Sequence, residues 1–296
     1  MRKHYNNHAF YLILNTMDTE EIIVKCLNCG TEYTGKYCPN CGQKAKTKRL
    51  KFWEIVADLN NFVIGGDNKF LNTLHGLCRR PGHMVREYIQ GHRSQYYNPL
   101  QMLIWILSIY AVLSFVIGSD PFEITTAQEE IVPKGDSPWQ IWLAYLDKVF
   151  GFIKHNKLYY TLACAFMAIG PYRFSFRKYK ISRPDGTNLA LNSTEQFYAF
   201  LYQSCMEMMF ATLLLPFCLI KGAEGILEDI NNVADILFTL ILYKQLYRIG
   251  WWKNIKRNLV AFILFVLVVS LFAILAFTLV LGTYYLIYGF DEFITK

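Results

Sequence analysis

Four cysteines near the N-terminus have the spacing of a metal site. They form two Cys-X-X-Cys-Gly motifs, the first with Cys26 and Cys29 and the second with Cys38 and Cys41. Four thiolates at this spacing can occupy the corners of a tetrahedron, which is the geometry of structural Zn²⁺ sites. The glycine after each pair permits a left-handed turn that directs backbone N–H groups at the sulfur atoms. We therefore predict one structural Zn²⁺, and because four cysteines leave no open coordination position, the pattern disfavours a catalytic metal.

Two carboxylates form a second candidate site. Glu207 lies near the middle of one long apolar segment and Asp235 lies within the next. A carboxylate at membrane depth is costly, so both residues are candidates for a proton relay or a ligand pocket. The alternative is a neutral, protonated side chain packed against polar helix faces, or a side chain that snorkels at the edge of the membrane. The short connection at 221–225 favours neighbouring antiparallel helices, which places the carboxylates within about two helical turns of each other in depth. The polar neighbours expected for such a pocket are Gln203, Asn231 and Asn232.

The composition indicates a membrane protein. Hydrophobic residues make up 53% of the 296 residues, and the 22 Phe and 20 Tyr are more than an ordinary soluble surface accommodates. A helix needs roughly 20 apolar residues to cross a bilayer. We predict an all-α integral membrane protein with a helical transmembrane bundle at 100–290 and about five spans, the third of them kinked or ended near Pro216. The spans are expected near 100–118, 158–172, 196–220, 226–247 and 259–281.

The charge distribution predicts the orientation of these spans. Lys and Arg number ten in 44–93, five in 173–183 and five in 244–257, against four in 119–157 and one in each of 221–229 and 291–296. The positive-inside rule places the basic segments in the cytoplasm, with the N-terminus inside and the C-terminus outside. The predicted zinc thiolates are an independent argument for the same orientation. Thiolates persist in the reducing cytoplasm, so the N-terminal part of the chain is expected there.

The segments outside the bundle have separate expected roles. An N-terminal extension (1–25) precedes the zinc ribbon (26–43), and a basic linker (44–51) is either attracted to anionic headgroups or a solvated tether. Amphipathic juxtamembrane helices are expected within 52–99, the first at 52–63 and the second after Asp67. They could form a small soluble bundle or lie flat on the membrane, and their basic character and the span that follows favour the membrane surface. An interfacial helix is expected at 139–152, and 291–296 is a C-terminal tail.

The stretch Arg79–Pro99 connects the polar and apolar parts of the chain. Pro81 suits the first position of a helix and Gly91 a position just past its end. The periodicity places Met84, Val85, Tyr88 and Ile89 on one face, with His83, Arg86, Glu87 and Gln90 on the other. This pattern predicts a short basic helix on the inner membrane surface that leads into the first span.

These motifs resemble a bacterial membrane-protein family of unknown function, the domain of unknown function 3667. The resemblance rests on a CxxCG…CPxCGQ ribbon followed by an RPGxxxREYIxGxRxxYxxP stretch. The matching residues are Cys26, Cys29, Cys38, Cys41, Gly42 and Gln43, then Arg80, Pro81, Gly82, Arg86, Glu87, Tyr88, Ile89, Gly91, Arg93, Tyr96 and Pro99. The family tends to carry Glu followed by His where this chain has Glu195 and Gln196, which argues against a Glu-His metal or proton site. The resemblance implies a bacterial cytoplasmic membrane location and supplies no activity.

Two classes of function remain open. No GxSxG, HExxH or phosphate-loop pattern is present, so no catalytic residue is assigned. The favoured interpretation is a non-enzymatic scaffold or regulator whose ribbon docks a cytosolic protein partner while the spans anchor it in the lipid bilayer. The alternative is a small transporter or lipid-handling protein that uses Glu207 and Asp235. Nucleic-acid binding is disfavoured because the basic linker lacks interleaved aromatic residues.

Overall fold

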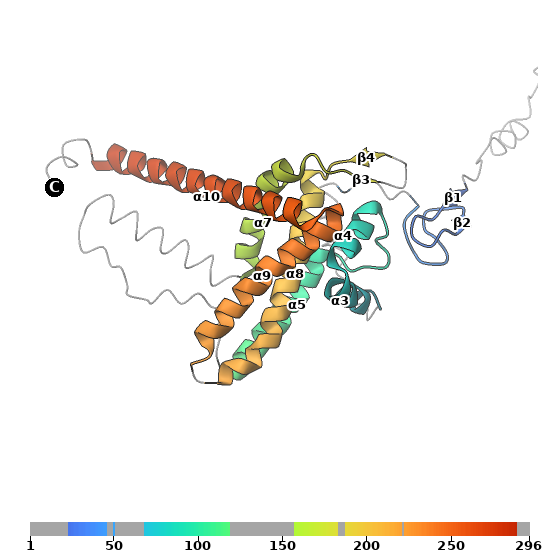
Figure 1. Ribbon diagram of the computed structural model, residues 1–296, viewed down its shortest axis with the longest axis horizontal. Coiled ribbons are helices and arrows are strands. Elements are labelled where there is room, and N and C mark those ends of the chain that lie inside the picture. The colour runs from blue at the N-terminus through green and yellow to red at the C-terminus, as the bar shows by residue number, and fades with distance from the viewer. Residues whose placement is uncertain are drawn as a thin grey trace, which may run out of the picture.

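The structure is a computed structural model that describes residues 23–45, 50, 68–118, 157–182, 187–220 and 222–288. Several predicted segments lie outside these residues, namely the helix at 52–63, the interfacial helix at 139–152, the tail at 291–296 and most of the N-terminal extension and basic linker. The described part is mostly helical, with a small ribbon at its N-terminal end (Figure 1).

The ribbon contains two very short strands. β1 (Val24–Lys25) and β2 (Glu32–Tyr33) pair antiparallel, and a single bridge joins Tyr37 to Lys44. The buried hydrophobic residues of the ribbon are Cys26, Tyr33 and Cys38. A core of this size buries too little apolar surface to fold the segment, so the fold needs a further source of stability such as a metal.

Two short helices follow the ribbon. α3 (Asn68–Arg79) and α4 (Pro81–Gln90) are joined by Arg80 alone, and Pro81 occupies the first turn of α4 as predicted. Gly91 ends α4 in the left-handed conformation at φ 115°, which also agrees with the prediction. α4 packs on α9 and α8 within the helical assembly, so its environment differs from that of a helix lying on a membrane surface.

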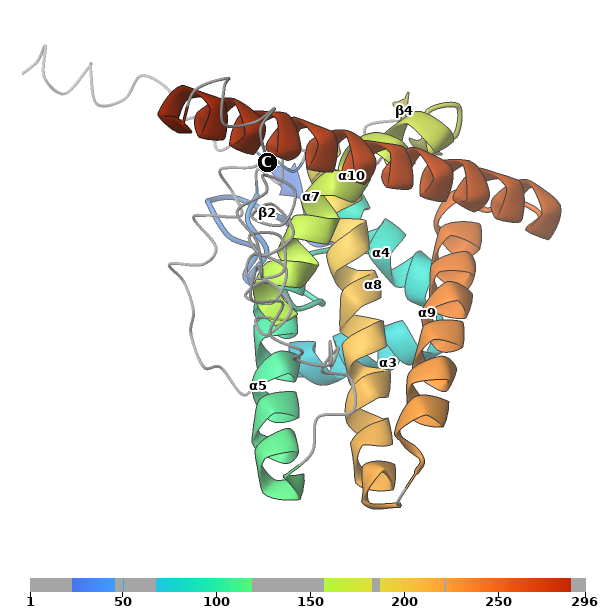
Figure 2. The same cartoon turned by 90° about the vertical axis from the view of Figure 1, so that its left-hand side faces the viewer.

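Three helices lie side by side, with α8 between the other two (Figure 2). They are α5 (Pro99–Ile117), α8 (Ser193–Leu214) and α9 (Glu224–Tyr247). α8 is followed directly by a 3₁₀ turn, η1 (Leu215–Leu219), which contains Pro216 as predicted. α5 begins at Pro99 because the side chain of Asn98 caps the N–H of Leu100 at 3.0 Å.

A fourth helix, α7 (Lys157–Phe176), packs against α8 and α10. The helix extends beyond the span predicted near 158–172, because α7 continues to Phe176 and includes Pro171. Arg173 ends the apolar run but not the helix, since arginine is a good helix former. A hairpin of β3 (Ile181–Ser182) and β4 (Asn188–Leu189), which the sequence did not predict, connects α7 to α8.

The last helix, α10 (Trp251–Tyr288), runs across the ends of α8 and α9 instead of alongside them (Figure 2). The amide of Asn254 donates to the carbonyl of Leu240 on α9 at 2.7 Å, and the hydroxyl of Ser175 on α7 donates to the carbonyl of Arg257 at 2.7 Å. These two contacts hold the first turns of α10. Its later turns project from the assembly as an exposed apolar helix, which differs from the side-by-side packing of a helical bundle.

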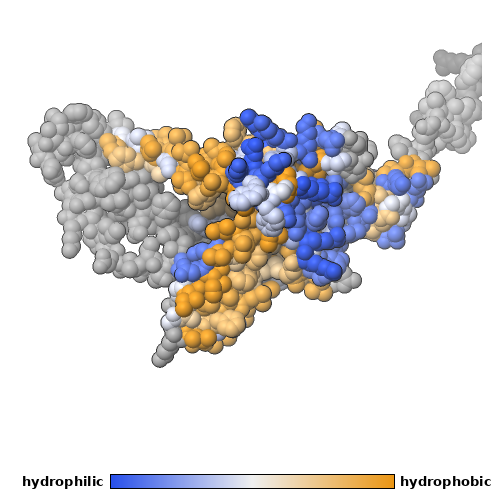
Figure 3. All heavy atoms as spheres, viewed as in Figure 1, coloured by the Kyte–Doolittle hydropathy of each residue, from blue (hydrophilic) through white to orange (hydrophobic). Residues whose placement is uncertain are grey.

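Among the described residues, three helical segments are long and apolar enough to cross a membrane. They are Pro99–Ile117, Ser193–Leu219 and Trp251–Leu279, in which 28%, 50% and 6% of the most apolar window is buried. An apolar helix that is almost entirely exposed requires a non-aqueous environment, so the chain has the character of a membrane protein. The apolar surface covers α10 and one end of the α8–α9 pair, whereas polar residues gather near α4 and the ribbon (Figure 3).

Candidate metal centre, helix clamp and intramembrane carboxylates

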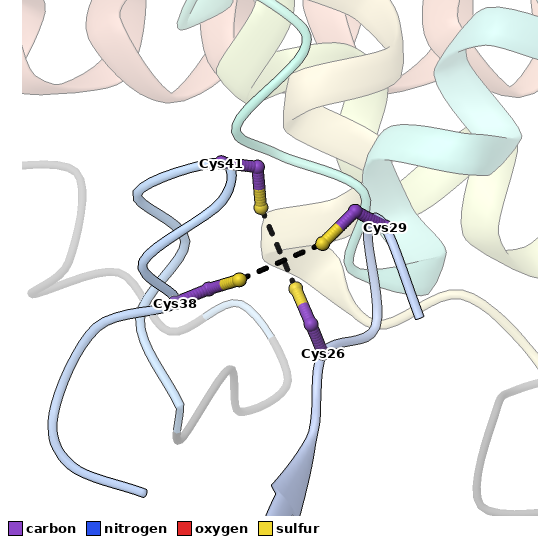
Figure 4. Close-up of side chains that lie close together, drawn as sticks. All are labelled: Cys26, Cys29, Cys38 and Cys41. Carbon is purple, nitrogen blue, oxygen red and sulfur yellow. Dashed lines mark hydrogen bonds between the residues drawn. The ribbon is translucent and has the colours of Figure 1, made fainter. Parts of the chain in front are cut away.

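The four cysteines of the two motifs converge on one point (Figure 4). Their sulfur atoms all lie within 4.8 Å of one another, and the Cys26–Cys41 and Cys29–Cys38 sulfur pairs are each separated by 3.5 Å. A disulfide bond would require about 2.05 Å. Four sulfurs at about 2.3 Å from a tetrahedral Zn²⁺ are roughly 3.8 Å apart, so the observed cluster has close to the size of a metal site.

The backbone around the cysteines repeats the same turn twice. The N–H of Gly30 donates to the carbonyl of Cys26 at 3.0 Å, and the N–H of Gly42 donates to that of Cys38 at 2.9 Å. Both glycines are left-handed, with φ values of 77° and 69°, which confirms the predicted conformation. Because other residues rarely adopt this conformation, the two glycines allow each pair of cysteines to face the same point.

The surroundings shift the thiols of the cluster in opposite directions. Hydrogen bonds with the side chain and backbone of Thr31 lower the pKa of the Cys29 thiol to about 6, whereas burial raises the pKa of the Cys38 thiol to about 11. A bound metal would favour the thiolate form of all four residues, because the thiolate is the form that binds it. Thiolates are ligands for Zn²⁺ and other soft metals, so the donor set fits the predicted cofactor.

The ribbon also contacts the helical assembly. The side-chain oxygen of Gln43, which closely follows the second motif's cysteines, accepts a hydrogen bond from the N–H of Ser94 at 3.4 Å. Ser94 lies in the loop between α4 and α5, so the metal centre is placed beside the loop that leads into the first candidate span. Gln43 is 5% exposed, which is unusual for a ribbon of this size and reflects this contact.

The predicted solvent face of α4 is instead a packing face. Arg86 was expected opposite Met84 and Val85, yet its side chain is only 9% exposed. Its guanidinium donates to the carbonyl of Leu246 near the C-terminal end of α9, with Nε at 2.8 Å and Nη2 also bonded. The last carbonyls of a helix have no partner within the helix, so Arg86 satisfies one that would otherwise be buried and unpaired. Burial lowers the pKa of Arg86.

Gly82 allows α4 to approach α9 backbone to backbone. A Cβ at this position would lie 2.2 Å from the carbonyl oxygen of Leu242 and 2.5 Å from the nitrogen of Leu246. The N–H of Gly82 donates to the side-chain oxygen of Gln245 at 3.0 Å. Gly82 and Arg86 are four residues apart, hence on one face of α4, and together they hold the C-terminal turn of α9. We call this contact the α4–α9 clamp.

The other motif residues make contacts outside the clamp. Tyr88 stacks on Tyr198 and meets Tyr202 edge to face, with ring centroids 5.8 Å and 5.5 Å apart. Glu87 accepts a hydrogen bond from the hydroxyl of Tyr96 and pairs with Arg80 at 3.3 Å. Burial, together with the adjacent Glu87, raises the pKa of Tyr96 to about 12, so its hydroxyl stays a donor at neutral pH.

Motif residues also make contacts in the connection from α4 to α5. The N–H of Arg93 donates to the carbonyl of Gly91. At the start of α5, the carbonyl of Pro99 accepts a hydrogen bond from the thiol of Cys205 at 3.5 Å.

The two carboxylates lie on neighbouring helices, as expected. The amide of Gln203 on α8 donates to the carboxylate of Asp235 on α9 at 3.1 Å. Glu207 lies one turn beyond Gln203 on α8, and Tyr160 of α7 lies in the neighbourhood of both carboxylates. The direct polar contact between helices in this region is the hydrogen bond that joins Gln203 to Asp235. Among the predicted polar neighbours, Asn231 is buried and Asn232 is exposed.

Glu195 has a structural role that the sequence signalled through an Asn-X-X-Glu pattern. Its side chain is fully buried and accepts from the N–H of Asn192 at 2.9 Å, while the side chain of Asn192 accepts from the N–H of Glu195 at 2.7 Å. This reciprocal pair caps the start of α8. The following Gln196 donates to the hydroxyl of Tyr243, so both residues make structural contacts at the start of α8.

The family comparison concerns the segment that contains the clamp. A family model described as a protein of unknown function (DUF3667) matches residues 67–111, which include α3, α4 and most of α5. No curated protein and no solved structure matches the chain. The segment that supplies the α4 side of the clamp is therefore similar to the domain of unknown function 3667.

Proposed function

We propose that the protein is a membrane-anchored, non-enzymatic scaffold or regulator whose ribbon binds one Zn²⁺ and docks a cytosolic protein. The membrane is the bacterial cytoplasmic membrane. The observation that carries this proposal is the four-cysteine cluster, because its sulfurs enclose one point and leave no room for a substrate ligand. A closed site of this kind stabilises a fold and presents its surface to a partner.

The surface of the ribbon favours a protein partner. Ile23 and Tyr37 are 70% and 58% exposed on a segment with a very small core. Exposed apolar and aromatic side chains are common anchors of protein interfaces. The contact between Gln43 and Ser94 holds the ribbon beside the α4–α5 loop, so a docked partner would lie next to the membrane-embedded helices.

The same proposal includes the orientation of the chain. Five spans, with the ribbon in the cytoplasm and the C-terminus outside, follow from the basic segments and the positive-inside rule. Helices occupy all five predicted positions, and three of these meet the length and composition of a span. The basic stretches beside α7, α9 and α10 would then lie at the cytoplasmic face.

Site-specific crosslinking in living cells tests the docking proposal. A photoreactive residue in place of Tyr37 should yield a discrete protein adduct that disappears when Cys38→Ser is added, because the ribbon then loses a metal ligand. The matched control places the same residue at Leu213, which is 70% exposed on α8 and should give no protein adduct. An adduct that persists with Cys38→Ser, or its absence from the Tyr37 position, would overturn the proposal.

A second candidate function is transport or lipid handling through Glu207 and Asp235. The bond between Gln203 and Asp235, with Tyr160 nearby, favours it because polar groups converge at membrane depth. The combined variant Glu207→Gln, Asp235→Asn preserves shape and removes both charges. Under this alternative it fails to complement a deletion strain, whereas full complementation would eliminate the transport interpretation.

A further inference from the structure

A cavity of about 570 Å³ lies between α3, the start of α4 and the loop that precedes α5. It contains neither the cysteine cluster nor the two carboxylates. The residues that line it are Asn72, His75, Gly76, Arg79, Arg80, Gln95 and Tyr96. A water molecule occupies roughly 30 Å³ in the liquid, so this cavity is large enough for a phosphate group with part of the molecule that carries it.

Two arginines contribute to the lining of this cavity. Arg79 and Arg80 are adjacent and exposed, and His75 lies one helical turn before Arg79 on the same face of α3. In the described part of the chain, Arg79 has no ion-pair partner. The negative charge of the nearby Glu87 is balanced by its ion pair with Arg80. The same carboxylate accepts a hydrogen bond from the hydroxyl of Tyr96. Among the described residues, Arg79 therefore contributes the uncompensated positive charge of the lining.

The hydrogen-bond donors that line the cavity suit the oxygen atoms of a bound oxyanion. A guanidinium presents a planar set of N–H groups that binds phosphate oxygens in pairs. The side-chain amides of Asn72 and Gln95 add neutral donors from α3 and from the loop before α5. Such a mixture of charged and neutral donors matches the several oxygen atoms of one phosphate group.

The cavity also lies next to a candidate membrane span. Tyr96 is three residues before Pro99, where α5 begins. If α5 crosses the bilayer, the cavity lies at the level where lipid headgroups carry their phosphates. The same chemistry would bind a phosphate ester from the cytosol.

We propose that this cavity is a phosphate-binding site in which Arg79 and Arg80 hold the phosphate oxygens and His75, Asn72 and Gln95 complete the donor set. The phosphate belongs either to an anionic phospholipid headgroup or to a soluble phosphate compound. Arg80 also forms an ion pair with Glu87, so replacing it would disturb a contact within the protein. Replacing Arg79 should therefore affect phosphate binding with less effect on the fold.

Binding measurements on the full-length protein in neutral detergent test this proposal. One arm titrates phosphatidylglycerol against phosphatidylcholine and counts bound lipids by native mass spectrometry. The other arm titrates inorganic phosphate at constant ionic strength and measures the melting temperature. Arg79→Gln should weaken binding by about tenfold or more, and Arg79→Lys by less, because the charge remains but the paired contact is lost.

The matched control is Arg177→Gln, which removes the same charge from an exposed position just after the end of α7. Selective retention of phosphatidylglycerol that Arg79→Gln abolishes and Arg177→Gln preserves identifies a lipid headgroup site. Stabilisation by phosphate alone, with the same response to the variants, identifies a soluble ligand. Absence of both effects, or an equal response of the two variants, overturns the proposal.

Discussion

The guanidinium of Arg86 on α4 bonds the main-chain carbonyl of Leu246 on α9, which joins residues 160 positions apart in the sequence. Leu246 is the second-to-last residue of α9, where carbonyl groups point along the helix axis without partners. A cation at this end also interacts favourably with the helix dipole. Arg86 is thus a cap for α9 that comes from a distant segment.

We expect Arg86→Met to destabilise the protein by roughly 1.5–3 kcal/mol, because a buried carbonyl loses a charged hydrogen-bond donor. Arg86→Lys should recover only part of this loss, since an ammonium cannot reproduce the two guanidinium contacts. Chemical unfolding in detergent measures the difference. Arg177→Met, at an exposed position, is the control and should change the free energy of unfolding very little. Equal stability of Arg86→Met and the native chain would contradict the clamp.

Gly82→Ala should be destabilising although alanine is the better helix former. The added Cβ would lie 2.2 Å from the carbonyl oxygen of Leu242, so α4 must move away from α9 at a cost of about 1–3 kcal/mol. Gly170→Ala is the matched control, because Gly170 is also helical and a Cβ added there would have nothing within 4 Å. We expect this control to be neutral or slightly stabilising. The reverse order of the two effects would show that the close approach is absent.

The purified full-length protein should contain one Zn²⁺ per chain. Elemental analysis of protein prepared under reducing conditions measures this ratio, and Cys26→Ser combined with Cys41→Ser should abolish it. Cys78→Ser is the control, since Cys78 is an exposed cysteine of α3 outside the cluster. Stoichiometric metal in the double variant, or none in the native protein, contradicts the site. Because Zn²⁺ displaces protons from thiols, the affinity should fall as the pH decreases.

Gln203 and Asp235 should be energetically coupled. In a double-mutant cycle with Gln203→Leu and Asp235→Asn, we expect a coupling of about 0.5–1.5 kcal/mol, because the two side chains share a hydrogen bond at 3.1 Å. A parallel cycle that pairs Gln203→Leu with Asn232→Leu serves as control, since Asn232 is exposed. If the free-energy changes of the two substitutions in the first cycle are additive, the contact between Gln203 and Asp235 does not form part of a site.

Reporter fusions distinguish a crossing α10 from one that stays at the membrane surface. Fusions after Arg183 and Arg257 should report a cytoplasmic location, and a fusion after Lys296 an external one. α10 lies across α8 and α9 in the structure, so crossing requires α10 and this helix pair to be reoriented relative to each other in the bilayer. A cytoplasmic signal after Lys296 would show that α10 does not cross and would reduce the number of spans.

Local chemistry made several features predictable from the amino-acid sequence. The spacing of Cys26, Cys29, Cys38 and Cys41 indicated a metal site, and the sulfurs of these residues do converge. Pro216 indicated the end of α8, and Gly91 the end of α4. Each of these features depends on a few consecutive residues, so the pattern and its cause lie in the same short segment. The apolar runs likewise revealed the helices, because membrane helices are apolar along their whole length.

The tertiary structure alone decided where the polar residues of those helices point. Periodicity placed Arg86 on an outward face, since a local pattern contains no information about Leu246 on α9. The same limit explains why the role of Gly82 was missed, as its close contact belongs to a second helix. The crossing of α10 follows from its packing on α7 and α9, which includes the hydrogen bonds made by Ser175 and Asn254. Helix positions follow from chain composition, but the contacts between helices follow from packing among residues that are distant in the sequence.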